Sequence, residues 1–409
     1  MKISVLGLGY IGLPTSLLLA NAGYDIVGID VDTKIVNTLS NGNLPFKEPG
    51  LDDLFKSAIN KFKASTNVES SDVYIIAVPT PLDEEIKIAD ISYVKNASRS
   101  IGKVINRDQL VILESTVPPG TSENVVLPIL KDSCSSGFYY AYCPERAIPG
   151  KTIGEMVSND RIIGAINEES YKKTKEIYAS FVKGNIYESN VKTAEFVKLM
   201  ENTYRDINIA LANEFSLIAE EFGIDIWKAI RLANHHPRVD ILNPGPGVGG
   251  HCLAIDPFFL AGKSKNSRIV KLAREINDFM AFHVVKSAKK MIGDIHNPTI
   301  TLLGLAYKGD VDDVRESPSL KIKKIAEGEG FNVKAFDPLV KDRSSSCKDI
   351  NEASLGSDCI ILVTDHSEFK NIDPKTLLVR NKNLLDTRNF LDHELWENAG
   401  FKVKLLGRS

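Results

Sequence analysis

The chain opens with Ile3-Ser4-Val5-Leu6-Gly7-Leu8-Gly9-Tyr10-Ile11-Gly12, and this stretch decides the fold of its first part. Residues 3–6 have the character of a buried strand. In the glycine motif that follows, Gly7 permits a tight turn, Gly9 lets the backbone approach a pyrophosphate, and Gly12 allows close helix packing. The motif predicts a strand–turn–helix unit whose helix N-terminus binds a pyrophosphate through free amides and the helix dipole.

A carboxylate at the end of the next strand completes this pattern. Residues 26–30 form the second predicted strand, and Asp30 lies about 20 residues beyond the glycine motif, where such an acid hydrogen-bonds ribose hydroxyls. A carboxylate there repels a 2′-phosphate, so the sequence predicts NAD and not NADP. Thr80 and Thr116 lie in loops that leave later strands on the cofactor side. The predicted cofactor contacts from this part of the chain are Gly7, Gly9, Tyr10, Ile11, Gly12, Asp30, Thr80 and Thr116.

The order of strands and helices predicts an α/β protein with two Rossmann-like, doubly wound parallel sheets joined by a helical middle domain. Strands are expected at 73–78 and 111–113, with a helix at 11–21. From 193 to 221 there is no glycine or proline, and apolar residues recur at helical spacing; 267–292 is similar. The strand pattern then returns at 299–304 and 333–337, with a helix at 317–328. The predicted domains are residues 1–190, 191–292 and 293–409.

Composition limits the functional classes that need consideration. The 409 residues fit two or three domains, and 50 basic against 53 acidic residues give no indication of nucleic-acid binding. Five cysteines without a CxxC spacing argue against a disulfide framework or a structural zinc, so no metal is expected. No apolar run approaches the roughly 20 residues of a membrane span. The apolar start is interpreted as a buried strand and not an export signal, and the predicted location is cytoplasmic.

The second informative stretch is a glycine-rich run, residues 245–250, that ends at His251-Cys252. A thiol in this setting is suited to covalent chemistry on a small molecule. Cys252 precedes an expected helical turn whose amides favour the thiolate, and Asp256 lies one turn further on. A nicotinamide site combined with a presented cysteine predicts an oxidation that passes through a sulfur-bound intermediate.

A polar stripe runs along the helix predicted at 193–221. Lys198, Asn202 and Arg205 recur at i, i+4 and i+7, and Glu195 and Asn213 extend the stripe. The other faces are apolar, so the stripe is expected to line a wet cavity. Lys198 is suited to act as a base or to donate to a developing oxyanion, and Asn202 to donate to the same oxygen or to an ordered water.

Two readings compete with such an oxidation. A hydroxyacid dehydrogenase explains neither Cys252 nor a second nucleotide-like domain. An NAD-sensing regulator has no need of Cys252, Lys198, Asn202 and Asp256 together. Both alternatives leave residues of the pattern without a purpose.

Further motifs carry a family resemblance over nearly the whole chain. They are Glu-Ser-Thr-Val-Pro-Pro-Gly-Thr from Glu114, Cys-Pro-Glu-Arg from Cys143, Gly-Gly-His-Cys at Cys252, and Gly304-Leu-Ala-Tyr-Lys-Gly-Asp through Arg315-Glu-Ser-Pro. Together with the Lys198/Asn202 helix they resemble the nucleotide-sugar 6-dehydrogenases of the UDP-glucose dehydrogenase superfamily, in the family's order. The resemblance is closest to the UDP-N-acetyl-D-mannosamine dehydrogenase branch.

The resemblance implies a four-electron oxidation of a sugar C6 alcohol to a carboxylate with two NAD. Cys252 would carry the thiohemiacetal and the thioester, Lys198 or Asp256 would hold the water that accepts the first proton, and Glu145 would be the base for thioester hydrolysis. Arg315 resembles the family's cofactor-contacting arginine. The substrate contacts implied by motif are Arg146, Ala147, Lys198, Asn202, Arg205, His236, Arg238, Gly247, Tyr307, Lys308 and Arg388.

Substrate and assembly follow from the same resemblance. Glucose-type members carry a lysine directly before the aspartate, whereas this chain has Ile255 before Asp256, which favours an N-acetylhexosamine. UDP-N-acetyl-D-mannosamine is the expected substrate, and UDP-N-acetylglucosamine or another UDP-hexosamine with the same mechanism is the alternative. Family members dimerise through the middle helices, so a homodimer or homotetramer is expected.

Overall fold

The structure is a computed structural model that describes residues 1–83, 85–135, 137–262, 264–342 and 344–408. The chain forms two compact units. The first comprises Met1–Glu201 and a short return that begins at Phe258, and the second comprises Asn202–Pro257 and the chain from Ser264 onward. Within the described residues, no helix is both long enough and apolar enough to cross a membrane.

The first unit is built on an eight-stranded sheet with the strand order β10-β9-β8-β7-β4-β1-β2-β3. All pairs are parallel except β8 with β9, which run antiparallel. The strands are β1 (Lys2–Leu6), β2 (Asp25–Ile29), β3 (Phe62–Ser65), β4 (Val73–Ile76), β7 (Leu110–Leu113), β8 (Tyr139–Tyr142), β9 (Arg161–Ala165) and β10 (Ile186–Asn190), with a separate hairpin of β5 (Leu82–Asp83) and β6 (Ile88–Ala89).

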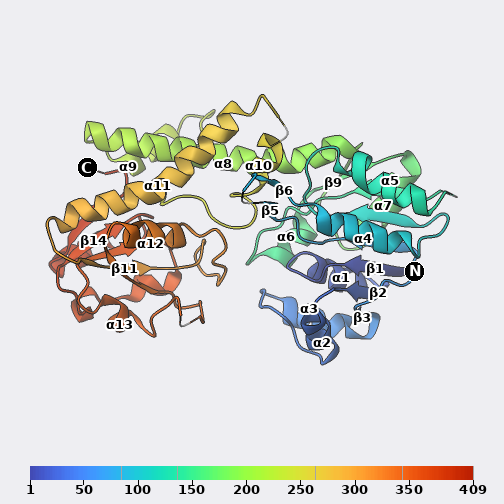
Figure 1. The fold of residues 1–409 in the computed structure, drawn as a ribbon, viewed down its shortest axis with the longest axis horizontal. Coiled ribbons are helices and arrows are strands. Elements are labelled where there is room, and N and C mark those ends of the chain that lie inside the picture. Colours follow the sequence, from blue (N-terminus) through green and yellow to red (C-terminus); the bar gives the residue numbers. More distant parts are fainter. Residues whose placement is uncertain (84, 136, 263, 343, 409) are drawn as a thin grey trace. The chain divides into compact units, whose positions relative to one another are not determined.

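Helices cover both faces of this sheet (Figure 1). Alternate strand residues explain the two layers: Val73 and Ile75 of β4 pack in one core cluster, and Tyr74 and Ile76 pack in the other. Such two-sided burial is what a doubly wound sheet requires. The helical elements are α1 (Gly12–Asn21), α2 (Thr33–Ser40), α3 (Leu51–Ala58), η1 (Ile59–Lys61), α4 (Ser92–Gly102), η2 (Ser122–Val126), α5 (Leu127–Ser133), α6 (Thr152–Ser158) and α7 (Glu168–Ala179).

The middle of the chain is helical, as the sequence predicts. Its helices among the described residues are α8 (Val191–Phe222), α9 (Ile226–Ala233), α10 (Asp256–Ala261) and α11 (Arg268–Ile292), of which α9 was not predicted. The predicted bounds of α8 and α11 differ from the observed ones by at most two residues at either end, because a long run without glycine or proline leaves little choice of boundary.

The second unit contains a five-stranded, wholly parallel sheet with the order β12-β11-β13-β14-β15. Residues of α11 and α12 pack on one face, and Phe369 and Trp396 belong to the core on the other. The predicted fold class is therefore confirmed; the three domain boundaries remain a prediction. The elements are β11 (Thr299–Leu303), α12 (Pro318–Gly328), β12 (Asn332–Phe336), α13 (Ile350–Ser354), β13 (Cys359–Leu362), η3 (Ser367–Asn371), η4 (Pro374–Thr376), β14 (Asn383–Asp386), α14 (His393–Asn398) and β15 (Lys402–Leu405).

Candidate active site

The glycine motif between β1 and α1 forms a cradle that has room for a ligand at one position only. A Cβ on Gly7 would lie 2.5 Å from the carbonyl oxygen of Ala77, and one on Gly12 would lie 1.8 Å from that of Gly7. A Cβ on Gly9 would meet no protein atom within 4 Å. The open backbone at Gly9 is the surface that a pyrophosphate needs, so the residues present fit NAD.

Asp30 follows β2 and faces this cradle. Its Oδ2 accepts a hydrogen bond from the amide of Leu8 (2.8 Å), and its Oδ1 accepts one from the amide of Asp32 (2.9 Å). The residue is half-buried. A carboxylate has about four acceptor positions, so Asp30 fixes the glycine turn and still has two positions for ribose hydroxyls.

The loops after β4 and β7 meet beside the cradle because β4 pairs with β1 and β7 is the next strand, paired with β4. The hydroxyl of Thr80 donates to the carbonyl oxygen of Thr116 at 2.8 Å, so two predicted cofactor residues are in contact. Glu195 anchors the second loop: its carboxylate accepts from the amides of Gly120 (2.5 Å) and Ser122 (2.8 Å), and burial raises its pKa. Glu195 therefore holds the loop that carries Thr116.

Cys252 lies in the turn that leads into α10. Its carbonyl oxygen accepts from the amides of Ile255 (3.1 Å) and Asp256 (2.8 Å), which confirms the predicted helical turn. The buried Asn202 donates through Nδ2 to Asp256 Oδ2 at 2.5 Å, and Arg205 donates to Asn202 Oδ1 at 2.5 Å. The fold thus brings Cys252, Asp256, Asn202 and Arg205 together around one turn.

The glycine run before Cys252 is threaded through a space with no room for side chains. A Cβ on Gly249 or Gly250 would lie 2.8 or 2.9 Å from Tyr307, and one on Gly247 would lie 3.0 Å from the carbonyl oxygen of Asn277. The amide of Gly245 donates to Asn213 Oδ1 at 2.8 Å. The glycines are therefore required by packing, and they bring Tyr307 and Gly247 next to the Cys252 turn.

A buried polar network on α8 and α11 supports that run and was missed by the sequence analysis. Asp206 accepts from Arg274 (2.6 Å) and from Asn277 (2.8 Å), and Asn277 accepts from Asn213 (2.8 Å). Burial raises the pKa of Asp206, although Arg274 opposes the rise. The signal was available, since Asp206 lies four residues after Asn202 on the predicted stripe.

Glu145 and Arg146 follow β8 and are both engaged by protein partners. Glu145 accepts from the amides of Arg146 and Ala147 and from the buried Arg161. Arg146 pairs with Glu201 of α8 and donates to the carbonyl oxygen of Asp160 at 2.9 Å. Glu201 and Arg161 were not predicted; an arginine beginning an apolar strand was the signal for the latter.

Lys198 is buried on α8, one turn before Asn202. The predicted substrate and cofactor residues of the second unit that remain are more exposed than Lys198. Lys308 follows Tyr307 and is half-buried, and Arg315 is exposed and pairs with Asp313 at 2.6 Å. Arg388 donates to Asp365 at 3.2 Å, and a Cβ on Gly245 would lie 2.9 Å from its guanidinium.

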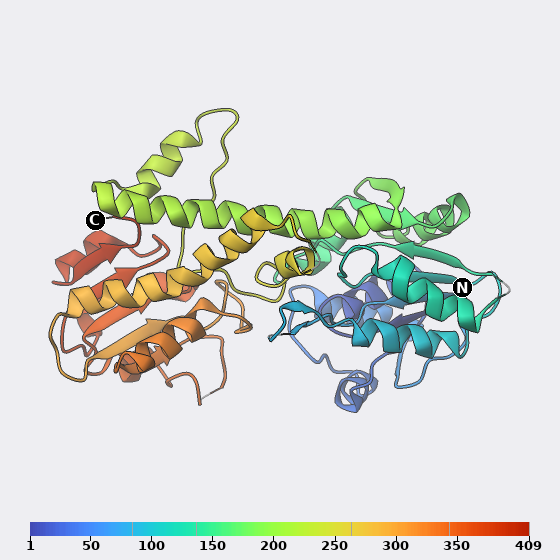
Figure 2. The same ribbon diagram turned by 45° about the horizontal axis from the view of Figure 1, so that its top comes forward.

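His236 and Arg238 lie in the segment after α9. Both are exposed, and the guanidinium of Arg238 lies 3.3 Å from Nε2 of His236. In Figure 2 α9 and the segment that follows it stand out from α8. The predicted substrate role of His236 and Arg238 stays a prediction.

Comparison with known proteins identifies the family. The UDP-glucose/GDP-mannose dehydrogenase family matches in three parts: its NAD binding domain at residues 1–182, its central domain at 192–279 and its UDP binding domain at 301–393. The chain belongs to this family. It is therefore an NAD-dependent nucleotide-sugar dehydrogenase, as the sequence predicted.

Relatives of this dehydrogenase match it along its full length. The UDP-N-acetyl-D-mannosamine dehydrogenase of Methanococcus vannielii is 47% identical over 99% of this chain and 97% of its own. The solved structure of the Pyrococcus horikoshii UDP-N-acetyl-D-mannosamine dehydrogenase is 40% identical with a TM-score of 0.93, covering 100% of this chain and 99% of that one. A Staphylococcus aureus UDP-N-acetyl-mannosamine dehydrogenase is 39% identical with a TM-score of 0.90, covering 100% and 98%.

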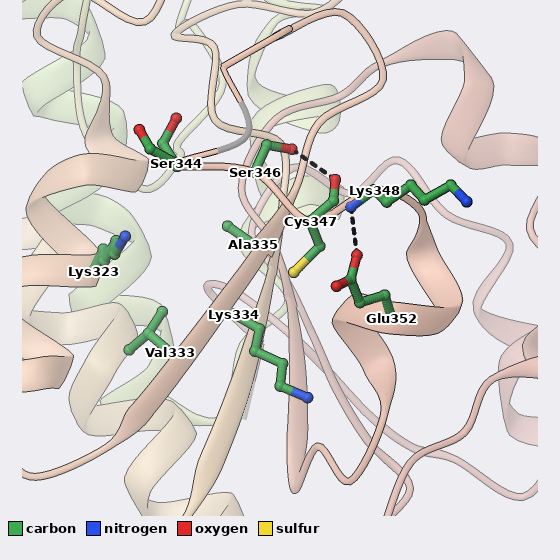
Figure 3. Close-up of a pocket in the computed structure, with 10 residues that line it drawn as sticks. Lys323, Val333, Lys334, Ala335, Ser344, Ser346, Cys347, Lys348 and Glu352 are labelled. Atoms are coloured by element: carbon green, nitrogen blue, oxygen red, sulfur yellow. Dashed lines mark hydrogen bonds between the residues drawn. The ribbon is translucent and has the colours of Figure 1, made fainter.

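A pocket of about 650 Å³ in the dehydrogenase lies along the edge strand β12 (Figure 3). Lys323, Lys334 and Lys348 line it, but their amines point in different directions, and Lys334 donates to the carbonyl oxygen of Leu355 at 2.8 Å. Cys347 also lines it. None of its lining residues is a predicted site residue, so this pocket is separate from the residues assembled around Cys252.

Proposed function

We propose that this dehydrogenase oxidises the C6 alcohol of UDP-N-acetyl-D-mannosamine to the carboxylate, giving UDP-N-acetyl-mannosaminuronate. The observation that carries the proposal is the turn that places Cys252 beside Asp256 and its partner Asn202. An alcohol-to-aldehyde oxidation needs no thiol, whereas oxidation of an aldehyde to an acid is eased by a covalent hemiacetal. Relatives that share 39–48% identity and carry this substrate in their names support the choice of sugar.

The reaction proceeds in three stages on the protein. The C6 alcohol first gives its proton to a water that is held by Lys198 or Asp256. Its carbon also loses a hydride, and the product is the aldehyde. The Cys252 thiolate then adds to C6, and the thiohemiacetal loses a second hydride and its hydroxyl proton to become a thioester. Water adds to the thioester, the carbon–sulfur bond breaks, and the carboxylate and the Cys252 thiol are released. NAD, when bound, accepts the hydride in each oxidation.

The polar residues have separate roles in these stages. Lys198 and Asn202 donate to the C6 oxygen as negative charge develops on it. Asp256 orients Asn202, as their 2.5 Å hydrogen bond indicates. Glu145 accepts a proton from the hydrolytic water. Removal of an oxyanion donor of this kind costs about 10²–10³ in kcat.

The residues around the two nucleotides follow the same assignment. Gly7, Gly9, Tyr10, Ile11 and Gly12 hold the pyrophosphate of NAD, Asp30 holds its ribose, and Thr80, Thr116 and Arg315 complete the cofactor site. The UDP-sugar is held by Arg146, Ala147, Arg205, His236, Arg238, Gly247, Tyr307, Lys308 and Arg388, with Lys198 and Asn202 at C6. Arginines suit a diphosphate because a guanidinium bridges two oxygens.

The proposal extends to assembly and location. Seven large apolar residues on α8 are exposed at spacings of three, four or seven: Phe196, Met200, Tyr204, Leu211, Phe215, Ile218 and Phe222. Such a stripe is costly in water, and a second copy of the chain would cover it, in a homodimer or a homotetramer. Three domains at 1–190, 191–292 and 293–409 and a cytoplasmic location, favoured by the cysteine pattern, complete the proposal.

Turnover on a panel of UDP-sugars tests the substrate. UDP-N-acetyl-D-mannosamine is expected to be oxidised with two NADH formed per sugar and no free aldehyde, and UDP-glucose poorly. Each acetamido partner left unpaired costs roughly 1–3 kcal/mol, so two separate the sugars by about 10². Equal kcat/KM for UDP-N-acetyl-D-mannosamine and UDP-N-acetylglucosamine would refute the proposed choice of substrate but not the proposed type of reaction. One NADH per sugar would refute the thioester.

Cys252→Ala tests the nucleophile directly. Acid formation should be lost while NAD binding stays normal, because the thiol acts only in the covalent stages. Retention of more than about a tenth of turnover, a loss of only about 1.4 kcal/mol, would show that Cys252 is not the nucleophile.

A further inference from the structure

A buried cluster of charges lies behind Glu145 in the first unit. Arg161 begins β9, and its guanidinium is 2.5 Å from Glu145 and 3.6 Å from Glu114. The side chains of all three are at most 5% exposed. Two carboxylates therefore share one guanidinium inside the protein. Burial of so many charges is expensive, and breaking such a set by removing one member costs about 3–5 kcal/mol.

The hydrogen bonds of Glu145 fix the direction of its carboxylate. Its Oε1 accepts from the amides of Arg146 (2.6 Å) and Ala147 (2.8 Å), and, among the residues that the structure describes, its Oε2 accepts from Arg161. With about four acceptor positions per carboxylate, one position on Oε2 is left. The direction of that position is set by Arg161, because the other oxygen is fixed by the main chain.

Arg161 is in turn packed against two aromatic rings and lies near a second carboxylate. Its guanidinium stacks over the rings of Tyr178 (4.8 Å) and Phe181 (5.7 Å). Glu114, which attracts it from the other side, accepts from the hydroxyls of Tyr178 (2.9 Å) and Thr15 (3.2 Å). A planar, stacked guanidinium cannot be replaced by an ammonium without loss of direction.

We propose that Arg161 is a positioning residue that aims Oε2 of Glu145 at the hydrolytic water, and that Glu114 sets how firmly it does so. Because this role rests on the proposed function, it concerns the third stage of the reaction, hydrolysis of the thioester. Neither Arg161 nor Glu114 needs to touch the sugar. Misplacement of a reacting group by about 1 Å costs roughly 10²-fold in rate.

Glu114 gives the arrangement a pH dependence. Burial raises its pKa to about 7; Arg161 opposes the rise and Glu145 adds to it. The groups that face it are Arg161 from β9, Glu145, the Cys143 thiol directly after β8, Tyr178 from α7 and Thr15 from α1. Above pH 7 the charged Glu114 attracts the guanidinium as a second ion partner, so Arg161 is fixed more firmly and aims Oε2 of Glu145 at the water. Hydrolysis should therefore rise with a step near pH 7 that Glu114→Gln removes.

Pre-steady-state kinetics with NAD and the UDP-sugar test both residues. Arg161→Lys should release two NADH per site in a first fast phase and then turn over roughly 10²-fold more slowly than wild type, with the acyl adduct on Cys252 seen in the intact protein mass. Glu114→Gln should keep the fast phase and lose the step near pH 7. Arg380→Lys is the matched control: Arg380 pairs with the buried Asp358 of the second unit, and this variant should behave as wild type.

Other outcomes would overturn the proposal. An Arg161→Lys enzyme with a fast steady state, or one with a slow first phase and no adduct, shows that Arg161 does not act on hydrolysis. If hydrolysis by Glu114→Gln still shows a step near pH 7, Glu114 has no part in positioning Arg161. Glu145→Gln separates this failure from that of the proposed function. If Glu145→Gln accumulates the adduct and Arg161→Lys does not, the function stands and the positioning role falls; if neither does, the assignment of Glu145 itself is wrong.

Discussion

The two sheets repeat one strand–turn–strand unit and use it differently. Gly7 (φ 96°) follows β1 and donates to the carbonyl oxygen of Ile29, and Gly304 (φ 93°) follows β11 and donates to that of Phe336. Asp30 accepts from the amide of Leu8, and Asp337 accepts from that of Leu305. The backbone unit is the same at both places.

The carboxylates differ in what else they contact. Asp30 is half-buried and has acceptor positions to spare, whereas Asp337 is 1% exposed and is also bonded by Ala306, Leu339, Val340 and His366. Nε2 of the buried His366 lies 2.9 Å from Asp337, and its Nδ1 accepts from the amide of Asp310 (3.0 Å), which fixes the proton on Nε2. The same backbone unit thus leaves acceptor positions of Asp30 open in one sheet and buries Asp337 in the core of the other.

The second glycine position of the motif is also open in the first sheet and buried in the second. Gly-x-Gly-x-x-Gly in the first sheet becomes Gly304-x-Ala306-x-x-Gly309 in the second, and Ala306 is 1% exposed. The helix α12 begins only at Pro318, and Ser319 in its first turn donates to the carbonyl oxygen of Gly304 at 2.6 Å. At the second position of its motif, the second sheet has the buried Ala306 in place of the open backbone that a dinucleotide needs.

The largest expected effect comes from removing the buried carboxylate of Asp337. Asp337→Ala should lower the free energy of unfolding by about 3–5 kcal/mol, because His366 and the amides of Leu305 and Ala306 lose their acceptor. Asp30→Ala should cost only about 1 kcal/mol, since it loses fewer and more exposed bonds. Urea unfolding measures both. Equal losses for the two variants would contradict the contrast.

The next largest effect is expected from Gly9→Ala, which gives the first motif the alanine that the second motif has at this position. Gly9→Ala should weaken NAD binding by roughly 10²-fold, about 2.7 kcal/mol, at an unchanged melting temperature, because its Cβ meets no protein atom and only the pyrophosphate. Gly154→Ala in α6, where a Cβ is equally unhindered, is the control and should bind NAD normally. Calorimetric NAD titration decides the matter; normal affinity in Gly9→Ala would place the pyrophosphate elsewhere.

Asp30→Ala should also change cofactor choice, by a smaller factor. Without the carboxylate that repels a 2′-phosphate, the ratio of kcat/KM for NAD over NADP is expected to fall by about tenfold. The measurement is initial-rate kinetics with both cofactors. Equal use of NADP by the unaltered enzyme would show that Asp30 does not face the ribose.

The smallest effect concerns how the two sheets respond to pH. Burial opposes ionisation of Asp337, but His366 and the amides outweigh it and hold its pKa well below the usual 3.8, so its contribution to stability is lost as the pH falls. Burial raises the pKa of Glu114 from 4.5 to about 7, so its contribution is present below 4.5 and is lost as the pH rises through 7.

Glu114→Gln tests whether the contribution of Glu114 to stability is lost as the pH rises through 7. Glutamine cannot ionise, so the melting temperature of the variant relative to wild type should increase between about pH 5 and pH 8. Glu168→Gln on the exposed surface of α7 should show a flat difference over that interval. A flat difference for Glu114→Gln as well would mean that Glu114 is already ionised at pH 5.

The sequence by itself determined the features that depend on local spacing. The glycine motif and Asp30, the continuous helices α8 and α11, the Cys252 turn and the family were all predicted, because strand periodicity, glycine placement and helix period are properties of neighbouring residues. The same spacing placed an acid at 337 as at 30, and the local difference between the two motifs is that Ala306 stands in the second where Gly9 stands in the first.

Only the tertiary structure decided which of these groups are available for chemistry. His366 lies 29 residues after Asp337 and Arg161 lies 16 after Glu145, and each reaches its partner because sheet order brings separate strand ends together. Burial then sets the charge and the hydrogen bonds of the carboxylate, since desolvation depends on atoms from many segments of the chain at once. Spacing along a chain records which residues follow one another, but not which of them share an interior.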